Sequence, residues 1–217
     1  MASGHGGRFD FSSAAVIVAH PDDETLWAGG LILMHPECRW TAVALCRASD
    51  PDRAPKFRRV LAVLGASGDL GDLDDGADQA SLPDGAVAQA VVGLLPSGAR
   101  FDLVLTHGPH GEYTRHRRHE EASRAVAGLW TAGNLQAGAL WMFAYEDGGG
   151  SHLARAVAHA HRTETLPDGV WQEKRRIVTD LYGFGPESVE TRTTPAEEGF
   201  WCFGSPAAYE RWLRENG

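Results

Sequence analysis

The hexapeptide AHPDDE, residues 19–24, places one imidazole and two adjacent carboxylates directly after the apolar run at residues 14–18. Adjacent carboxylates raise each other's pKa and resist the loss of water, so a protein seldom places them side by side for stability. A divalent cation removes this conflict. We therefore expect His20 and one of the two aspartates, Asp22 or Asp23, to bind a metal ion.

A second pair of imidazoles, His116 and His119, follows about a hundred residues later. Residues three apart on a helix share a face, so in the helix predicted here both rings can point the same way. One of them would complete a His, Asp and His set with an open fourth position, the arrangement of a catalytic zinc ion, whereas four protein ligands would indicate a structural site. An isolated H-x-x-H is weak evidence, and its combination with AHPDDE carries the interpretation.

Apolar runs of strand length alternate with helical patterns along the first two thirds of the chain. The runs have the composition of strands buried on both faces, and we predict them at 14–18, 40–46, 101–106 and 139–145. Helices are predicted from about residue 24, at 56–64, at 85–95 and at 116–130. The segment 68–84 is rich in turn residues and has room for one short strand.

Strands alternating with helices predict βαβ units with right-handed crossovers. The predicted fold class is therefore α/β and Rossmann-like, with a mostly parallel sheet flanked by helices on both faces. One domain spans residues 1–217, with 1–12 as a flexible end. After residue 146 we predict helices at 152–162, 170–181 and 206–215, and an extended segment at 199–203. Both motifs follow strands, so they open onto the carboxyl edge of the sheet, where ligands bind in such folds.

Composition excludes several classes of function. The net charge of −9 disfavours nucleic acid as a partner. No apolar run approaches the length of a membrane span, and the N-terminus lacks the apolar core of a secretory signal. The three cysteines are widely spaced, which is typical of free thiols in a reducing compartment. We expect a cytoplasmic protein. The sequence is compatible with a homo-oligomer.

The two motifs together resemble those of the PIG-L / LmbE-like family of zinc-dependent N-deacetylases, whose signature is AHPDDE near the N-terminus and a later H-x-x-H. The similarity runs from about residue 14 to residue 130. The resemblance implies that His20, Asp23 and His119 bind zinc, that Asp22 is the general base, and that His116 is the acid and oxyanion partner.

The second motif departs from the family pattern. Many members have H-P-D-H, in which the aspartate can brace the catalytic histidine, whereas Arg117 and Arg118 fill the middle positions here. The residue that orients His116 is therefore open. Tyr113 lies one residue away from the spacing of a tyrosine that precedes the second motif in relatives.

The expected function is that of a metal-dependent hydrolase that removes an acetyl or acyl group from an N-acetylated small molecule. The resemblance implies an N-acetylglucosamine-type sugar or conjugate, and one Zn²⁺, with Fe²⁺ or Co²⁺ as alternatives. Zinc lowers the pKa of bound water to about 7, so Asp22 would take the proton of the water and His116 would protonate the departing amine. Such a base and acid together predict that activity depends on pH with a bell-shaped profile.

Candidate substrate-binding residues are Arg47, Arg53, His110 and Tyr113, which follow predicted strands at the active edge; each can equally be a loop residue. Two alternatives stay open, a non-catalytic carbohydrate- or metabolite-binding protein on the same fold and an amidase of a thiol or sugar conjugate. A nucleotide-binding protein is disfavoured because the first turn is acidic instead of glycine-rich. A Mg²⁺ phosphohydrolase is disfavoured because imidazoles are poor ligands for that cation.

Overall fold

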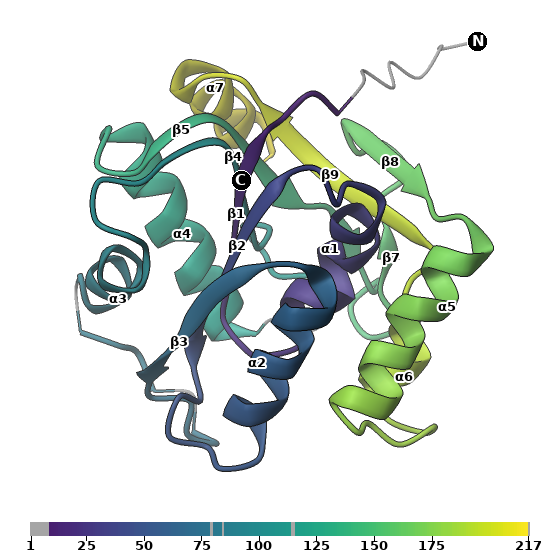
Figure 1. Ribbon diagram of the computed structural model, residues 1–217. Helices are drawn as coiled ribbons and strands as arrows, with labels where there is room; N and C mark the ends of the chain where they lie inside the picture. The colour runs from purple at the N-terminus through teal and green to yellow at the C-terminus, as the bar shows by residue number, and fades with distance from the viewer. Residues whose placement is uncertain (1–8, 79, 84, 114–115, 217) are drawn as a thin grey trace, which may run out of the picture.

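A seven-stranded sheet runs through the middle of the molecule (Figure 1). The computed structural model describes residues 9–78, 80–83, 85–113 and 116–216. Five neighbouring strands are parallel, and their spatial order is β3 (Ser67–Leu73), β2 (Arg39–Cys46), β1 (Ser13–Val18), β4 (Arg100–Thr106) and β5 (Gln136–Phe143). Antiparallel strands extend the sheet beyond β5, first β9 (Glu197–Phe203) and then β8 (Arg162–Thr165). The predicted fold class, a mostly parallel α/β sheet, is confirmed.

Helices cover both faces of the sheet. One face packs against α1 (Asp23–Met34), α2 (Arg53–Leu64) and the π-helical turn η1 (Ile177–Leu181), and α5 (Asp168–Arg176) packs against α1. The other face packs against α3 (Ala86–Leu94), α4 (Arg117–Thr131) and α7 (Pro206–Asn216). Side chains of β1 alternate between the two cores, with Val16 and Val18 in the first and Ile17 in the second. This alternation explains why the strand reads as a continuous apolar run.

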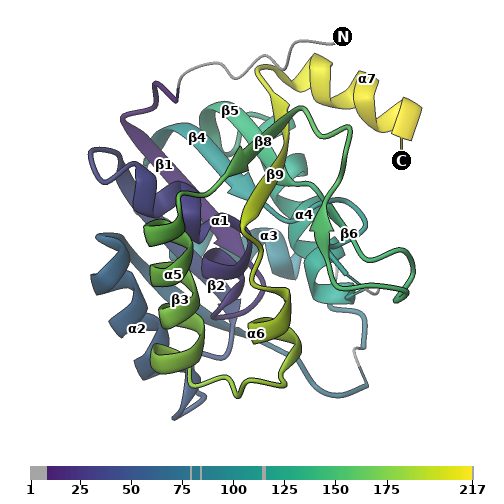
Figure 2. The ribbon, with the colours of Figure 1, turned by 90° about the vertical axis from the view of Figure 1, so that its right-hand side faces the viewer.

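The last third of the chain supplies the two antiparallel strands at one edge of the sheet and adds short elements. A hairpin forms between β6 (Tyr145–Glu146) and β7 (Arg155–Ala156), and α6 (Val189–Thr193) precedes β9. Figure 2 shows β9 between α5 on one side and α7 on the other. In the described part of the chain, no helix has both the length and the apolar character that a membrane crossing requires.

The helix predicted at 152–162 is wrong. This segment contains β7 and the start of β8, and the backbone N–H of Val157 donates to the carbonyl of Ala144 at 2.9 Å. Its backbone groups are therefore satisfied by pairing with the end of the sheet, which overrides a weak helical preference. The strand predicted at 139–145 is also divided, because β5 ends at Phe143 and Tyr145 begins β6.

The start of the described chain packs against the core. Phe9 is buried and stacks on His35 with ring centroids 4.1 Å apart, and it meets Trp141 edge-on. The hydroxyl of Ser12 donates to Asp102 at 2.7 Å. Of the flexible end predicted at 1–12, residues 1–8 lie outside the described residues, and 9–12 are held against the sheet.

Candidate metal centre

Four parallel strands end beside one another and deliver the polar side chains of the site. β1 leads to His20, β2 to Arg47, β4 to His107, and β3 to the acidic segment that contains Asp75. The edge of the sheet expected from the sequence is thus the edge at which these side chains gather, since parallel strands all present their carboxyl ends on the same side.

Three donor atoms face one another at this edge. Nδ1 of His20 lies 3.2 Å from Oδ2 of Asp23, Nε2 of His119 lies 3.4 Å from the same oxygen, and the two nitrogens are 3.3 Å apart. Zinc bonds of about 2.0–2.1 Å in a tetrahedral site place neighbouring ligand atoms roughly 3.3 Å apart. The set His20, Asp23 and His119 therefore fits one zinc ion, and two segments remote in sequence converge on it.

A carboxylate lies behind each of the two imidazoles. Nδ1 of His119 is 2.7 Å from Oε2 of Glu112, and Nε2 of His20 is 3.2 Å from Oδ1 of Asp75. Each carboxylate accepts a hydrogen bond from the outer nitrogen and leaves the inner nitrogen of the ring directed at Asp23. Carboxylates in this position fix the tautomer of metal-binding histidines and raise their basicity.

His107 has a different place in the network. Its Nε2 accepts a hydrogen bond from the backbone N–H of Ala19 at 2.9 Å, so its Nδ1 carries the proton and donates to Glu112 at 2.8 Å. The ring also stacks on His119 with centroids 3.9 Å apart. Asp23, His107 and His119 have donor atoms close enough to share an ion. Because the lone pair of His107 is already engaged, we assign it to holding Glu112 and His119 in place.

His116 lies just before α4, at the N-cap position, and not within the helix as predicted. Its ring still stacks on His119, with centroids 4.5 Å apart, and meets the ring of His20 at 4.7 Å. Its buried Nδ1 has no hydrogen-bond partner among the described residues. The brace that an aspartate can supply in H-P-D-H is therefore not replaced by another side chain of the described chain.

The two arginines of the second motif hold a loop instead. Arg118 is buried and donates to the carbonyls of Asp74 and Ala80 at 2.6 and 2.8 Å. Arg117 donates to the hydroxyl of Ser81 at 2.7 Å. The guanidinium of Arg118 thus fixes the acidic segment in the position from which Asp75 reaches His20.

Burial and the close imidazoles shift the pKa values of the two aspartates in opposite directions. Burial raises the pKa of Asp22 well above its usual range, and the charge of Asp23 adds to the effect. Burial also opposes the charged form of Asp23, but His119 and His107 outweigh it and hold the pKa of Asp23 well below its usual range. One carboxylate is thus kept charged for a cation, while its neighbour has a higher proton affinity.

The pKa values of His20, His119 and His116 also shift in different directions. Burial opposes the charged form of each, yet the carboxylates beside them raise the pKa of His20 to about 9 and that of His119 to about 10. Burial lowers the pKa of His116 to about 4, helped by His119 and His20. In the metal-free protein His116 is therefore neutral near pH 7, so its predicted role as a protonated acid stays a prediction.

Asp22 sits in a strained turn that a buried glutamate supports. Its φ of 134° lies in a region that residues other than glycine rarely adopt, a strain typical of functional sites. Its backbone N–H donates to Oε2 of the fully buried Glu24 at 3.0 Å. The hydroxyl of Tyr182 donates to the other oxygen of Glu24 at 2.6 Å. The segment after η1 therefore helps to hold the turn.

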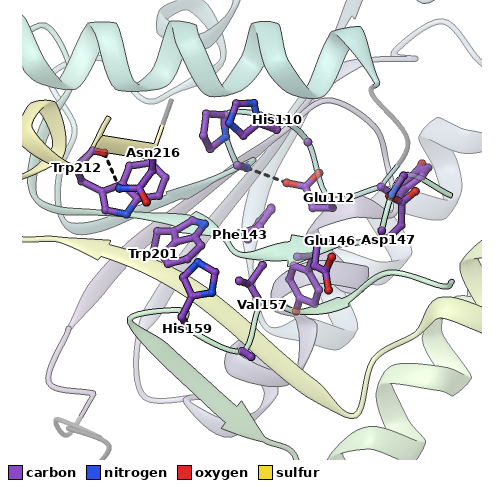
Figure 3. Close-up of a pocket in the computed structure, with 18 residues that line it drawn as sticks. His110, Glu112, Phe143, Glu146, Asp147, Val157, His159, Trp201, Trp212 and Asn216 are labelled. Atoms are coloured by element: carbon purple, nitrogen blue, oxygen red, sulfur yellow. Dashed lines mark hydrogen bonds between the residues drawn. The ribbon is translucent and has the colours of Figure 1, made fainter. Parts of the chain in front are cut away.

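A small polar pocket of about 180 Å³ opens beside the donor set. Arg47 and Arg53 both line it, Arg47 paired with Asp75 at 2.6 Å and Arg53 3.4 Å from Oδ2 of Asp22. Tyr113 also lines this pocket. His110 does not line it and instead lines a separate, larger cavity (Figure 3).

Sequence reasoning named residues that the structure brings together, His20, Asp23 and His119, and missed those that support them. Glu112 follows His107 by five residues, and this spacing after a buried strand was a usable signal. Asp75 is one of several aspartates in a turn-rich segment, and nothing in the sequence distinguishes it from the others. Tyr182 lies more than 150 residues from Glu24, beyond the reach of any local pattern.

No model of a known protein family matches the sequence, and no curated protein matches it. Solved structures do resemble the fold. The N,N'-diacetylchitobiose deacetylase from Pyrococcus horikoshii aligns over 92% of this chain and 86% of its own, with a TM-score of 0.68 and 15% identity. At such identities the likeness shows the fold, so the chain has the α/β architecture of these enzymes.

Two further structures show that this fold supports more than one chemistry. The 4-carboxy-2-hydroxymuconate hydratase GalB from Pseudomonas putida aligns over 84% of this chain and 83% of its own, with a TM-score of 0.60 and 18% identity. A zinc-inhibited form of a teicoplanin deacetylase aligns over 83% and 88%, with a TM-score of 0.57 and 12% identity. Function has to be inferred from the side chains of the site, because a shared fold does not decide it.

Proposed function

We propose that this protein is a zinc-dependent N-deacetylase that acts on an N-acetylated small molecule, an N-acetylglucosamine-type sugar or its conjugate. The observation that carries the proposal is the triangle of donor atoms from His20, Asp23 and His119, with sides of 3.2–3.4 Å. The other carboxylate of the first motif, Asp22, stands beside this triangle and is outside it. The fold shared with sugar and glycopeptide deacetylases supports the proposal by analogy.

Zinc bound by these three residues would polarise an amide carbonyl and make water a nucleophile near neutral pH. The set leaves one tetrahedral position without a protein ligand, as in catalytic sites. Glu112 and Asp75 keep the two imidazoles in the tautomers that the ion requires.

Asp22 is the proposed general base. Its carboxylate is buried, and burial raises its pKa, which increases its affinity for a proton taken from water. Glu24 holds the turn from which it projects, and Arg53 lies close to Oδ2. The position of the base is therefore fixed before the substrate arrives, which lowers the cost of reaching the reactive geometry.

His116 is the residue proposed to stabilise the negative charge that develops on the carbonyl oxygen. Its ring lies against His20 and His119, and no described side chain uses its Nδ1. A neutral imidazole still carries one N–H, which can donate to the oxygen as the charge grows. After receiving the proton that Asp22 takes from water, the same ring would protonate the departing amine, which leaves poorly as an anion.

The polar pocket suits the acetamido head of a small substrate. Its volume of about 180 Å³ is small, and Arg47 and Arg53 line it beside Asp22. Guanidinium groups can donate hydrogen bonds to hydroxyl or carbonyl oxygens. Glu190 from α6 closes one side of the pocket, so the segment after residue 148 contributes to the site.

The test is to load the purified protein with Zn²⁺, Fe²⁺ or Co²⁺ and to measure acetate and free amine from a panel of N-acetylated sugars. We expect both products in equal amounts, and their loss with a chelator. His20→Ala should lose the ion, whereas His116→Ala should keep it and lose most turnover. Addition of water to a conjugated alkene without acetate release from any amide would overturn the proposal in favour of a hydratase. Equal metal content in both variants would show that the ligands are misassigned.

A further inference from the structure

Residues 108–113 help to line a cavity of about 910 Å³ that is distinct from the polar pocket (Figure 3). It is about five times larger than the polar pocket and falls within the range of small-molecule sites. Most of its exposed wall is apolar. The proposed acetamido head does not occupy it, so it is available for another part of a ligand.

Aromatic side chains form one end of the cavity. Trp201 of β9 and Trp212 of α7 have ring centroids 5.1 Å apart, and both line the wall. Phe143 and Val157 lie beside Trp201 on the way to the opposite end (Figure 3). Such surfaces bind alkyl and ring groups by removing apolar area from water.

Glu146 and Asp147 lie at the opposite end from Trp212 and Asn216 (Figure 3). Carboxylates accept hydrogen bonds from hydroxyl groups and repel anions. Among the described residues that line the cavity there is no lysine or arginine. Glu146 is paired with Arg155 at 3.1 Å, and since the lining itself holds no cation among the described residues, it favours a neutral ligand with hydroxyl groups over a phosphate or sulfate ester.

The cavity adjoins the proposed active site. Of the described residues, Tyr113 alone lines both the cavity and the polar pocket. The loop between them also carries Glu112, which holds His119. A ligand with its amide at the donor triangle would have to pass Tyr113 to extend into the cavity.

We propose that the cavity binds the apolar part of the substrate, and that the substrate is a neutral amphiphile in which an alkyl or aromatic group is attached to the N-acylated sugar head. This inference rests on the proposed function for the position of the head. The apolar group lies against Trp201 and Trp212, and hydroxyl groups near the junction face Glu146 and Asp147. Affinity then comes mainly from the cavity, and the polar pocket supplies orientation and chemistry.

Binding is measured first, on the metal-free protein, with hexyl, octyl and decyl β-D-glucosides below their micelle concentrations. These probes have no amide, so the measurement is independent of catalysis. We expect calorimetric affinity to rise about two- to fourfold per methylene, the increase that burial of the chain predicts. Decyl phosphate should bind more weakly than decyl glucoside.

Two variants test whether the alkyl chain binds in the cavity. Trp212→Ala removes one aromatic wall, and Val157→Asp places a carboxylate in the apolar middle; each should reduce decyl glucoside affinity at least fivefold. Trp171→Ala, on α5 and outside the cavity lining, is the matched control and should bind as the wild type does. Affinity that does not rise with chain length, or that is unchanged in both cavity variants, overturns the proposal. If decyl phosphate binds more tightly than decyl glucoside, the proposal that the ligand is neutral is overturned.

Turnover is measured second, on the zinc-loaded protein, with alkyl N-acetylglucosaminides of the same chain lengths. We expect KM to fall with chain length while kcat changes little, because the chain binds away from the reacting atoms. Glucosides that bind in the cavity without acetate release from any N-acetylglucosaminide would overturn the proposed function and leave an amphiphile-binding cavity. Acetate release with a KM independent of chain length would overturn the cavity proposal and leave the deacetylase.

Discussion

The polar pocket and the apolar cavity share Tyr113 in their linings and are built in opposite ways. In the pocket, His20, Asp23 and His119 are each fixed by hydrogen bonds to other polar groups. In the cavity, the walls are mostly rings and aliphatic groups that place few directional demands on a ligand. Chemistry at an ion needs donor atoms fixed within tenths of an ångström, whereas recognition of an apolar group needs area.

This contrast predicts that changes in the pocket alter metal content and kcat, and that changes in the cavity alter affinity. The largest effect should follow Asp22→Asn, which removes the proposed base and keeps the shape of the side chain. We expect kcat to fall about 10²- to 10⁴-fold with zinc content unchanged, because general bases contribute rate factors of this size. Steady-state kinetics with metal analysis measures both.

The control for this prediction is Asp180→Asn, on an exposed aspartate of η1, which should keep full activity. Decyl glucoside should bind to Asp22→Asn as it binds to the wild type. A simultaneous loss of zinc would show that Asp22 is a ligand and would remove the distinction between the two aspartates.

Glu112→Gln sharpens the comparison at the supporting carboxylates. Oε2 of Glu112 accepts hydrogen bonds from His107 and His119, and Oε1 accepts one from the backbone N–H of Gly108. An amide can accept at one end only, so it cannot satisfy both sets of donors. We expect zinc affinity to fall about 10- to 100-fold, measured by competition with a chelator of known affinity. Glu210→Gln, on an exposed residue of α7, is the matched control. An unchanged affinity would mean that His119 does not bind the ion through Nε2.

Asp75→Asn should have a smaller effect in the same assay. Its contact with His20 is 3.2 Å, longer than the 2.7 Å contact of Glu112, and His20 is partly exposed to water. Because water can replace part of the lost hydrogen bond, we expect zinc affinity to fall only about three- to tenfold. Asp78→Asn is the control from the same acidic segment, and it should bind zinc normally. A larger effect than that of Glu112→Gln would reverse the order of the two supports.

Tyr182→Phe should give the smallest change in turnover. Its hydroxyl supports Glu24, which in turn holds the backbone of Asp22, so the effect on the base is indirect. We expect kcat to fall a few-fold with zinc unchanged, and the free energy of unfolding to fall by about 1–3 kcal/mol from the lost hydrogen bond. Tyr209→Phe, also buried, is the control in urea unfolding. A stability loss with unchanged kcat would make Tyr182 purely structural.

The inner site could be predicted because its residues are adjacent in the chain or follow buried strands. AHPDDE after a buried run placed His20, Asp22 and Asp23 at the carboxyl edge, and the helical spacing of the second motif placed His119 beside them. The strands at 14–18, 40–46 and 101–106 could be predicted because burial on both faces leaves a continuous apolar run. The helix predicted at 152–162 failed because pairing of β7 with β6, and of Val157 with the carbonyl of Ala144, outweighed local preference.

By itself, the sequence determined the class of fold, the edge at which the polar residues gather, and the residue types able to hold an ion. Only the tertiary structure decided which carboxylate supports which imidazole, since Asp75 and Tyr182 reach the site through long-range packing. It also decided that Arg118 is buried against a loop and that His110 faces a second cavity. The physical reason is that local patterns record which face of an element is buried, whereas contacts between distant segments depend on how all the elements pack together.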